Sequence, residues 1–112
     1  MKVVQLDLSD PEYCLKWAQE FAQNNHVDII VNNGGISQRD VFINSDFEIA
    51  KRLMNVNCLS PIAIIKGFMP SFQEYGQGHI VNVLSVAAQV GTPIRSFYST
   101  SKFALDGLGK AL

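Results

Sequence analysis

The sequence has few cysteines, modest charge and no long hydrophobic run. Its two cysteines are Cys14 and Cys58. Because they do not form a Cys-x-x-Cys pair, neither a zinc site nor a redox motif is indicated, and we expect two buried free thiols in a reducing compartment. Charged residues make up 17% of the chain, and the formal net charge is -1. Since no basic cluster is present, the composition argues against a nucleic-acid partner.

Two further absences concern targeting and nucleotide binding. The apolar stretches are too short for a membrane-spanning helix, and the N-terminal residues lack the layout of a signal peptide. The chain as written is therefore expected in the cytoplasm, without a membrane segment. No Gly-x-x-x-Gly-x-Gly or Gly-x-Gly-x-x-Gly segment precedes a predicted helix, although a dinucleotide fold holds the pyrophosphate with such a loop.

The hydrophobic pattern predicts three strands and three helices that alternate along one small domain, residues 1–112. The predicted strands are Val3–Leu6, Val27–Val31 and His79–Leu84, and the predicted helices are Pro11–Asn24, Asp46–Met69 and Ser96–Leu112. Ser9 with Glu12, and Ser45 with Glu48, are predicted capping boxes for the first two helices. The alternation indicates an α/β fold, with a parallel sheet and helices on its faces.

Tyr98 and Lys102 form the most informative pair in the chain. They are four residues apart in a predicted helix, which places both side chains on one face. An ammonium group close to a tyrosine favours the phenolate, so such a pair can transfer a proton. Ser85 follows a predicted strand, at the carboxyl end where open α/β sheets bind ligands. The alternative is an ordinary surface pair of tyrosine and lysine.

The triplet Ser85, Tyr98 and Lys102 resembles the active site of the short-chain dehydrogenase/reductase superfamily. Further segments that resemble the family are Asn32-Asn33-Gly34-Gly35, Asn55-Val56-Asn57 and Tyr98 to Leu105. Most members have alanine where this chain has Gly34. The resemblance implies a partial Rossmann-like, doubly wound parallel sheet that lacks the first βαβ unit and the C-terminal strands. The strands at Val3 and Val27 would then lie roughly 14 Å apart with nothing between them.

The resemblance implies an NAD(P)-dependent oxidoreductase that reduces a carbonyl or oxidises an alcohol by hydride transfer. Tyr98 would donate the proton, Ser85 would bind and orient the substrate oxygen, and Lys102 would hold the nicotinamide ribose and assist Tyr98. Asn57, at a helix distortion expected before Pro61, would hold a water that connects Lys102 to bulk solvent. The alternative for Asn57 is a contact with its own backbone.

The resemblance also assigns the adenosine half of the cofactor to Asp7, Asn33 and Gly34. Asp7 would meet the adenine amino group, and Asn33 and Gly34 would line the adenosine through their backbone. NADP is the expected cofactor and NAD the alternative. No residue is expected to bind a metal.

The segment from Asn32 to Arg39 resembles the dehydrogenase/reductase member 7 group, which are membrane-associated reductases of steroids, retinoids and similar carbonyls. This implies a lipophilic small-molecule substrate and allows an endoplasmic reticulum membrane location for a full-length relative. Contacts between copies are expected through helices 46–69 and 96–112. Two alternatives stay open. One is a truncated, non-catalytic form that associates with a full-length relative, and the other is a sugar-nucleotide epimerase, which the Asn-Asn-Gly-Gly turn disfavours.

Overall fold

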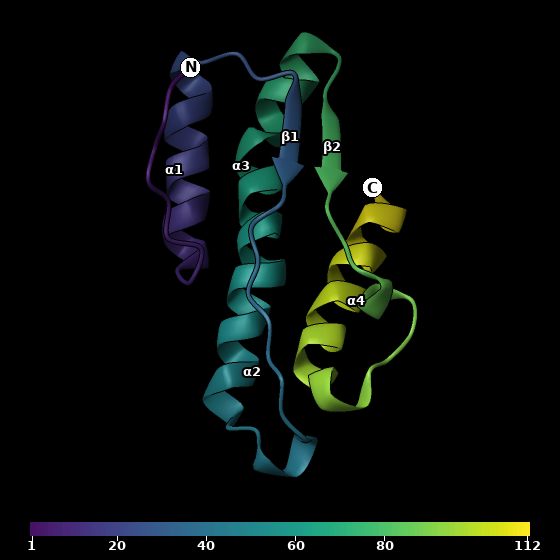
Figure 1. Ribbon diagram of the computed structural model, residues 1–112. Coiled ribbons are helices and arrows are strands. Elements are labelled where there is room, and N and C mark those ends of the chain that lie inside the picture. Colours follow the sequence, from purple (N-terminus) through teal and green to yellow (C-terminus); the bar gives the residue numbers. More distant parts are fainter.

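The computed structural model describes all 112 residues and has two parallel strands packed against helices (Figure 1). In chain order the elements are α1 (Pro11–Asn24), β1 (Ile29–Asn32), α2 (Phe47–Met54), a π-helix (Asn55–Leu59), α3 (Ser60–Tyr75), β2 (His79–Asn82) and α4 (Ser96–Ala111). Short 3-10 turns join several of them. The predicted α/β class is confirmed, and α1 has the predicted bounds.

The sheet consists of β1 and β2, which run parallel as predicted. Its register pairs Ile29 with His79 and Asn32 with Asn82. Burial alternates along β1: Ile30 packs into the core with α1 and α3, whereas Ile29 and Val31 on the opposite face are 56% and 59% exposed. One face of the sheet is therefore covered by helices and the other is open.

The predicted strand Val3–Leu6 is wrong. Residues 1–7 form no secondary structure and run beside α1, where the Lys2 ammonium lies 5.1 Å from the centroid of the Phe21 ring (Figure 1). A strand needs a neighbouring strand for its backbone hydrogen bonds. The sheet contains only β1 and β2, and neither pairs with this segment.

Aspartates begin the first two helices, so both predicted capping boxes are wrong. The side chain of Asp10 accepts a hydrogen bond from the Tyr13 N–H at 3.0 Å, and that of Asp46 accepts from the Glu48 N–H at 3.0 Å. Each aspartate stands directly before the first helical residue, where a side-chain oxygen can reach an unpaired N–H. The two serines, one residue further out, bond to other loop residues instead.

The second predicted helix is present, but it is interrupted and longer than expected. The π-helix between α2 and α3 ends at Leu59, two residues before Pro61, and the Ser60 N–H bonds to the Asn55 carbonyl. The predicted distortion is therefore confirmed. The expected end near Met69 is wrong, because α3 continues through Pro70 to Tyr75 and stops at Gly76, whose φ of 72° is a left-handed helix cap.

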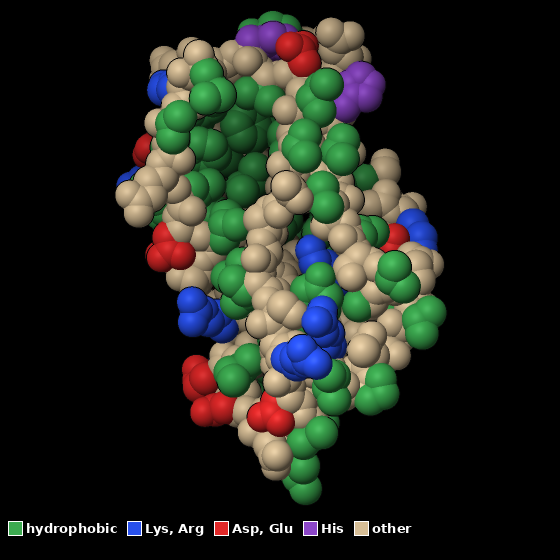
Figure 2. Space-filling view, viewed as in Figure 1, with side chains coloured by type: hydrophobic (Ala, Val, Ile, Leu, Met, Phe, Trp, Pro, Cys, Tyr) green, Lys and Arg blue, Asp and Glu red, His purple; other side chains and the backbone are tan.

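The hydrophobic core lies between α1, α3 and the covered face of the sheet. Its buried members are Ala18, Ile30, Phe68 and Phe72, and Trp17 and Phe21 pack around them. Figure 2 shows hydrophobic side chains in a hollow between the N-terminal segment and β1, so this core is open on one side. None of the helices has both the length and the apolar character to cross a bilayer.

Both cysteines are buried free thiols, as predicted. Burial raises the pKa of each thiol above its ordinary value of 9.0. The buried thiols are therefore poor nucleophiles at neutral pH, because the thiolate is the reactive form.

Candidate active site

A pocket of about 240 Å³ lies where β1 and β2 end, beside the first turns of α4. The lining residues are Asn33, Gly35, Ile36, Ser37, Val83, Leu84, Tyr98 and Lys102. The carboxyl edge of a parallel sheet is where open α/β folds bind ligands. Of the residues predicted for the site, the structure brings Asn33, Tyr98 and Lys102 together in this pocket.

Tyr98 and Lys102 lie on the pocket side of α4, as their spacing predicts. The Lys102 side chain is only 6% exposed, so it is not a surface lysine. Its Nζ donates to the Val83 carbonyl at 3.1 Å and lies 6.0 Å from the centroid of the Tyr98 ring. Tyr98 is half-buried, and its hydroxyl bonds to no protein atom. An ammonium has three donors, so Lys102 keeps two for a ligand.

Asn57 is fully buried in the π-helix and is bonded to the pocket wall. Its Oδ1 accepts from the Ile36 N–H at 2.8 Å, and its Nδ2 donates to the Ile36 carbonyl at 2.8 Å. The same Nδ2 donates to Ser101 Oγ at 3.0 Å. The alternative that Asn57 contacts its own backbone is wrong. A π-helical turn is rare and frequently marks a functional site.

Ser85 lies beyond the end of β2 and does not line the pocket. Its Oγ accepts from the Ala87 N–H at 3.2 Å and begins the 3-10 turn Val86–Ala88, on which α4 packs. The hydroxyl proton of Ser85 has no acceptor in the protein and stays available to a ligand.

Of the residues predicted for the adenosine half, Asp7 lies in the exposed turn before α1, and Asn33 and Gly34 directly follow β1. The Asp7 carboxylate accepts from the Ser9 N–H at 2.9 Å and from the Ser9 hydroxyl at 2.8 Å. These bonds hold the pKa of Asp7 below its ordinary value of 3.8. A Cβ placed on Gly34 would lie 2.5 Å from Leu8 Cδ1. The turn before α1 therefore touches the Asn33–Gly34 turn.

Four residues without a predicted role, Gly35, Ile36, Val83 and Ser101, lie against Asn57 or Lys102. A Cβ placed on Gly35 would lie 3.2 Å from Asn57 Oδ1 and 3.6 Å from Lys102 Nζ. Ile36 and Val83 act through main-chain atoms, which no side-chain pattern reveals. For Ser101 the sequence does offer an indication of a role, namely its position directly before Lys102.

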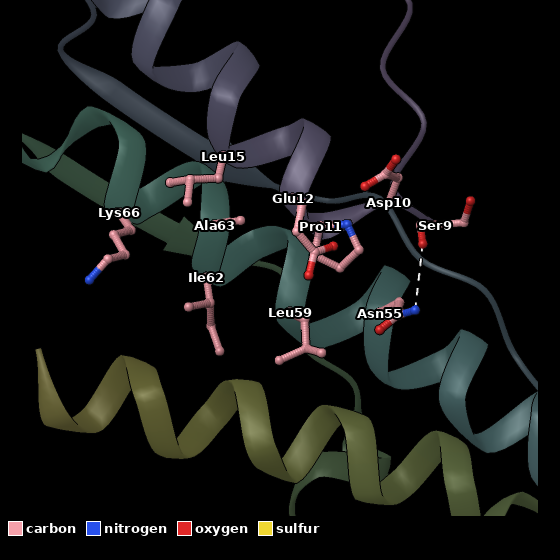
Figure 3. A pocket seen from close by; sticks show the side chains of 10 residues that line it. All are labelled: Ser9, Asp10, Pro11, Glu12, Leu15, Asn55, Leu59, Ile62, Ala63 and Lys66. Atoms are coloured by element: carbon pink, nitrogen blue, oxygen red, sulfur yellow. Dashed lines mark hydrogen bonds between the residues drawn. The ribbon is translucent and has the colours of Figure 1, made fainter.

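A larger hollow of about 570 Å³ lies between the start of α1 and the helix from Asn55 to Lys66 (Figure 3). Leu15, Leu59 and Ile62 are its larger apolar residues, and Asn55 Nδ2 donates to the Ser9 carbonyl at 3.5 Å. None of the residues predicted for the site lines this groove. The smaller pocket beside Tyr98 is therefore the candidate active site.

Fold and pocket define an α/β protein whose site lies at the carboxyl edge of a parallel sheet. Residues 1–112 match the family model of the short chain dehydrogenases, and the chain belongs to this family. It is 38% identical over 103 residues to dehydrogenase/reductase SDR family member 7B of Mus musculus, which covers 91% of this chain and 32% of that protein. It is also 38% identical over 114 residues to family member 7 of the same organism, over 98% and 33% of the two chains. The chain thus spans about a third of the length of these curated relatives.

Solved structures have the same fold. A protein of Beutenbergia cavernae, described as an NAD(P) dependent gluconate 5-dehydrogenase with bound NADP, matches with a TM-score of 0.95 and 30% identity, over 99% of this chain and 45% of that chain. A 4-hydroxyisoleucine dehydrogenase complexed with NADH matches with a TM-score of 0.89 and 30% identity, over 98% of this chain and 49% of that chain. The predicted family and the partial Rossmann-like fold are confirmed.

Proposed function

We propose that this chain carries the catalytic part of an NAD(P)-dependent oxidoreductase that interconverts a carbonyl and an alcohol by hydride transfer. The observation that carries the proposal is the burial of Lys102 beside Tyr98, in a pocket at the carboxyl edge of the sheet. Membership of the short chain dehydrogenase family supports the same activity, and it favours this proposal over the sugar-nucleotide epimerase.

The pocket fits the nicotinamide half of a dinucleotide. Gly35 presents bare backbone beside Asn57 and Lys102, so a ribose or a flat ring can approach the main chain. Lys102 has spare donors for ribose hydroxyls. When bound there, a nicotinamide supplies or takes up the hydride. NADP is the proposed cofactor and NAD the alternative, and the two solved relatives carry one each.

The adenosine half would lie along the surface where Leu8 meets Gly34. The second carboxylate oxygen of Asp7 is not used by Ser9 and would accept from the adenine amino group. Asn33 lines the pocket and directly precedes Gly34, so the two would hold adenosine through their backbone. This placement would run the cofactor from the start of α1 to α4.

In the reductive direction, Tyr98 donates its hydroxyl proton to the substrate oxygen as that oxygen gains negative charge. The electron pair stays on the Tyr98 oxygen, and the Lys102 ammonium stabilises the resulting phenolate. Ser85 donates to the same substrate oxygen and fixes its direction. Lys102 then passes a proton to the Tyr98 phenolate and regains one from bulk solvent through a water that Asn57 would hold.

The proposed substrate is a lipophilic carbonyl or alcohol, such as a steroid or a retinoid. This follows from the resemblance of the segment Asn32 to Arg39 to the member 7 group. The similarity of the whole chain to family members 7 and 7B supports that grouping.

A second candidate is a non-catalytic form that associates with a full-length relative or with its own copies. Exposed apolar side chains favour it, because large apolar patches mark interaction sites. Leu59 and Phe103, on the helices predicted for contacts between copies, are 43% and 44% exposed. If this candidate is right, the chain co-purifies with the relative and changes its turnover, and Tyr98→Phe does not alter that effect.

The catalytic proposal is tested in a chimera in which residues 1–112 replace the matched third of the mouse member 7B relative. We expect NADPH-dependent reduction of a steroid ketone or retinaldehyde. Tyr98→Phe should lower kcat about 10²-fold or more, because the ring stays packed and only the hydroxyl is lost. The dissociation constant of NADPH should not change.

The matched control is Tyr75→Phe. Tyr75 stands at the end of α3 with its ring against His26, and it does not line the pocket. This variant should keep the parental kcat. A Tyr98→Phe chimera with turnover within about tenfold of the parent would overturn the assignment of Tyr98.

A further inference from the structure

We infer that Ser101 is a positioning residue for this site, and that its hydroxyl sets the separation between the Tyr98–Lys102 face of α4 and the Gly35–Ile36 wall of the pocket. The inference rests on the proposed function, because it concerns the alignment of the groups assigned there. Ser101 itself is fully buried and does not line the pocket.

The direction of each hydrogen bond around Ser101 is fixed by chemistry. The Ile36 N–H can only donate, so the oxygen of the Asn57 carboxamide must face it at 2.8 Å. The Asn57 nitrogen must then face the Ile36 carbonyl and Ser101 Oγ. Because Nδ2 only donates, Ser101 accepts from it, and the Ser101 proton goes to the Tyr98 carbonyl at 2.7 Å. One hydroxyl thus joins Asn57 to the turn that carries Tyr98.

The hydrogen bond from Asn57 distinguishes Ser101 from an ordinary serine in a helix. A serine that bonds a carbonyl one turn earlier is common in helices. On the same helix, Thr100 does only this, with the Ser96 carbonyl at 2.9 Å. Ser99 accepts from the Thr92 N–H at 3.4 Å and has no contact with Asn57. Of these hydroxyls, only that of Ser101 connects α4 to the π-helix.

The connection reaches Lys102 through the pocket wall. Asn57 fixes the backbone of Ile36, and the neighbouring Gly35 is the residue whose Cβ would lie 3.6 Å from Lys102 Nζ. Without the Ser101 hydroxyl, Asn57 keeps a buried N–H with no acceptor, and the wall can shift against α4. Small misplacements of reacting groups lower rates strongly, although the substituted residue touches neither substrate nor cofactor.

The experiment compares three variants of the chimera. Ser101→Ala should lower kcat about 10- to 100-fold and move the midpoint of the pH–kcat profile, with the melting temperature close to that of the control. Ser101→Thr keeps the hydroxyl and should restore the parental midpoint. Ser99→Ala is the matched control, a buried serine three residues from Lys102 on the same helix, and should leave both quantities unchanged.

A double substitution keeps the test decisive if the extra methyl of Ser101→Thr disturbs folding. The effects of Asn57→Ala and Ser101→Ala on kcat should combine to no more than the larger single effect, because both break one connection. Additive effects, equal losses in Ser101→Ala and Ser99→Ala, or an unmoved pH profile in Ser101→Ala would each overturn the inference.

Amide exchange separates this inference from the proposed function. The Ile36 amide proton, bonded to Asn57, should exchange at least about tenfold faster in Ser101→Ala than in Ser99→Ala. If the parent chimera has no turnover but this exchange difference is found, the proposed function fails and the connection through Ser101 stands. Equal exchange rates would show that Ser101 does not hold the wall.

Discussion

Lys102 is buried with a single protein partner, the Val83 carbonyl. Lysines are almost never fully buried unless they are paired, because removing an ammonium from water is costly. No carboxylate forms an ion pair with Lys102. A site that binds a polyhydroxyl ligand and stabilises a developing phenolate needs such a buried charge with two unused donors. Packing alone would not favour such a charge.

Lys102→Met should therefore separate function from stability. Methionine keeps the length of the side chain and removes the charge, so the chimera should bind NADPH more weakly and turn over more slowly. An unpaired charge is costly to bury, so its replacement by an apolar group should not lower the melting temperature. Calorimetric titration, kinetics and thermal melting measure the three quantities. An unchanged dissociation constant would remove the ribose role of Lys102.

Gly34 and Gly35 offer a second comparison of single residues. A Cβ at Gly34 meets only the end of the Leu8 side chain, which can rotate, whereas a Cβ at Gly35 meets Asn57 Oδ1 at 3.2 Å. Asn57 cannot move without losing its bonds to Ile36. Gly34→Ala should thus keep kcat within about threefold of the parental value, and Gly35→Ala should lower it about tenfold or more. The reverse order would contradict the tight packing assigned to Gly35.

At the scale of elements, the sequence predicts those helices and distortions that depend on interactions between residues close in the chain. The bounds of α1 and the start of α4 follow from helical spacing and flanking residues, and the distortion before Pro61 follows from the missing N–H of proline. The strand at Val3 could not be judged locally, since a strand forms only where another strand can pair with it. Likewise, Tyr98 and Lys102 share a helix face by spacing, but the bonds from Asn57 to Ile36 and Ser101 depend on tertiary contacts.

The packing of α1 on α3 depends on Gly67. A Cβ there would lie 2.5 Å from Ala18 Cβ and 3.1 Å from the Gln19 nitrogen. Gly67→Ala should separate the two helices and lower the free energy of unfolding of the chimera by about 1–3 kcal/mol. Gly107 is also helical, but nothing lies within 4 Å of its Cβ position. Gly107→Ala should raise the free energy of unfolding by about 0.4–1 kcal/mol.

Urea denaturation of both variants, read by far-UV circular dichroism, measures these opposite changes. The comparison isolates packing, because both substitutions add one methyl group to a helical glycine. A Gly67→Ala chimera as stable as the parent would show that α1 moves away from α3 without loss, and that this contact contributes little.

At the scale of the whole molecule, the folded chain is elongated rather than compact. Its radius of gyration is 14.9 Å, compared with about 13 Å for a compact domain of this length. Ile29 and Val31 expose the uncovered face of the sheet, and β1 pairs on one side only. An unpaired edge beside exposed apolar side chains is a template for pairing with another chain.

We therefore expect the 112-residue polypeptide by itself to associate or to remain loosely packed, and to show no reductase activity. It should not bind NADP(H) or NAD(H) with micromolar affinity, because no glycine-rich loop precedes a helix to hold the pyrophosphate. Sedimentation, calorimetric titration with both nucleotides and amide exchange test this, with the chimera as the positive control for binding. A monomer with protected amides in β1 and β2 and micromolar affinity for either nucleotide would contradict the prediction. In that case, the two strands and the helices behind them would suffice for a stable fold, and the open edge of β1 would not limit it.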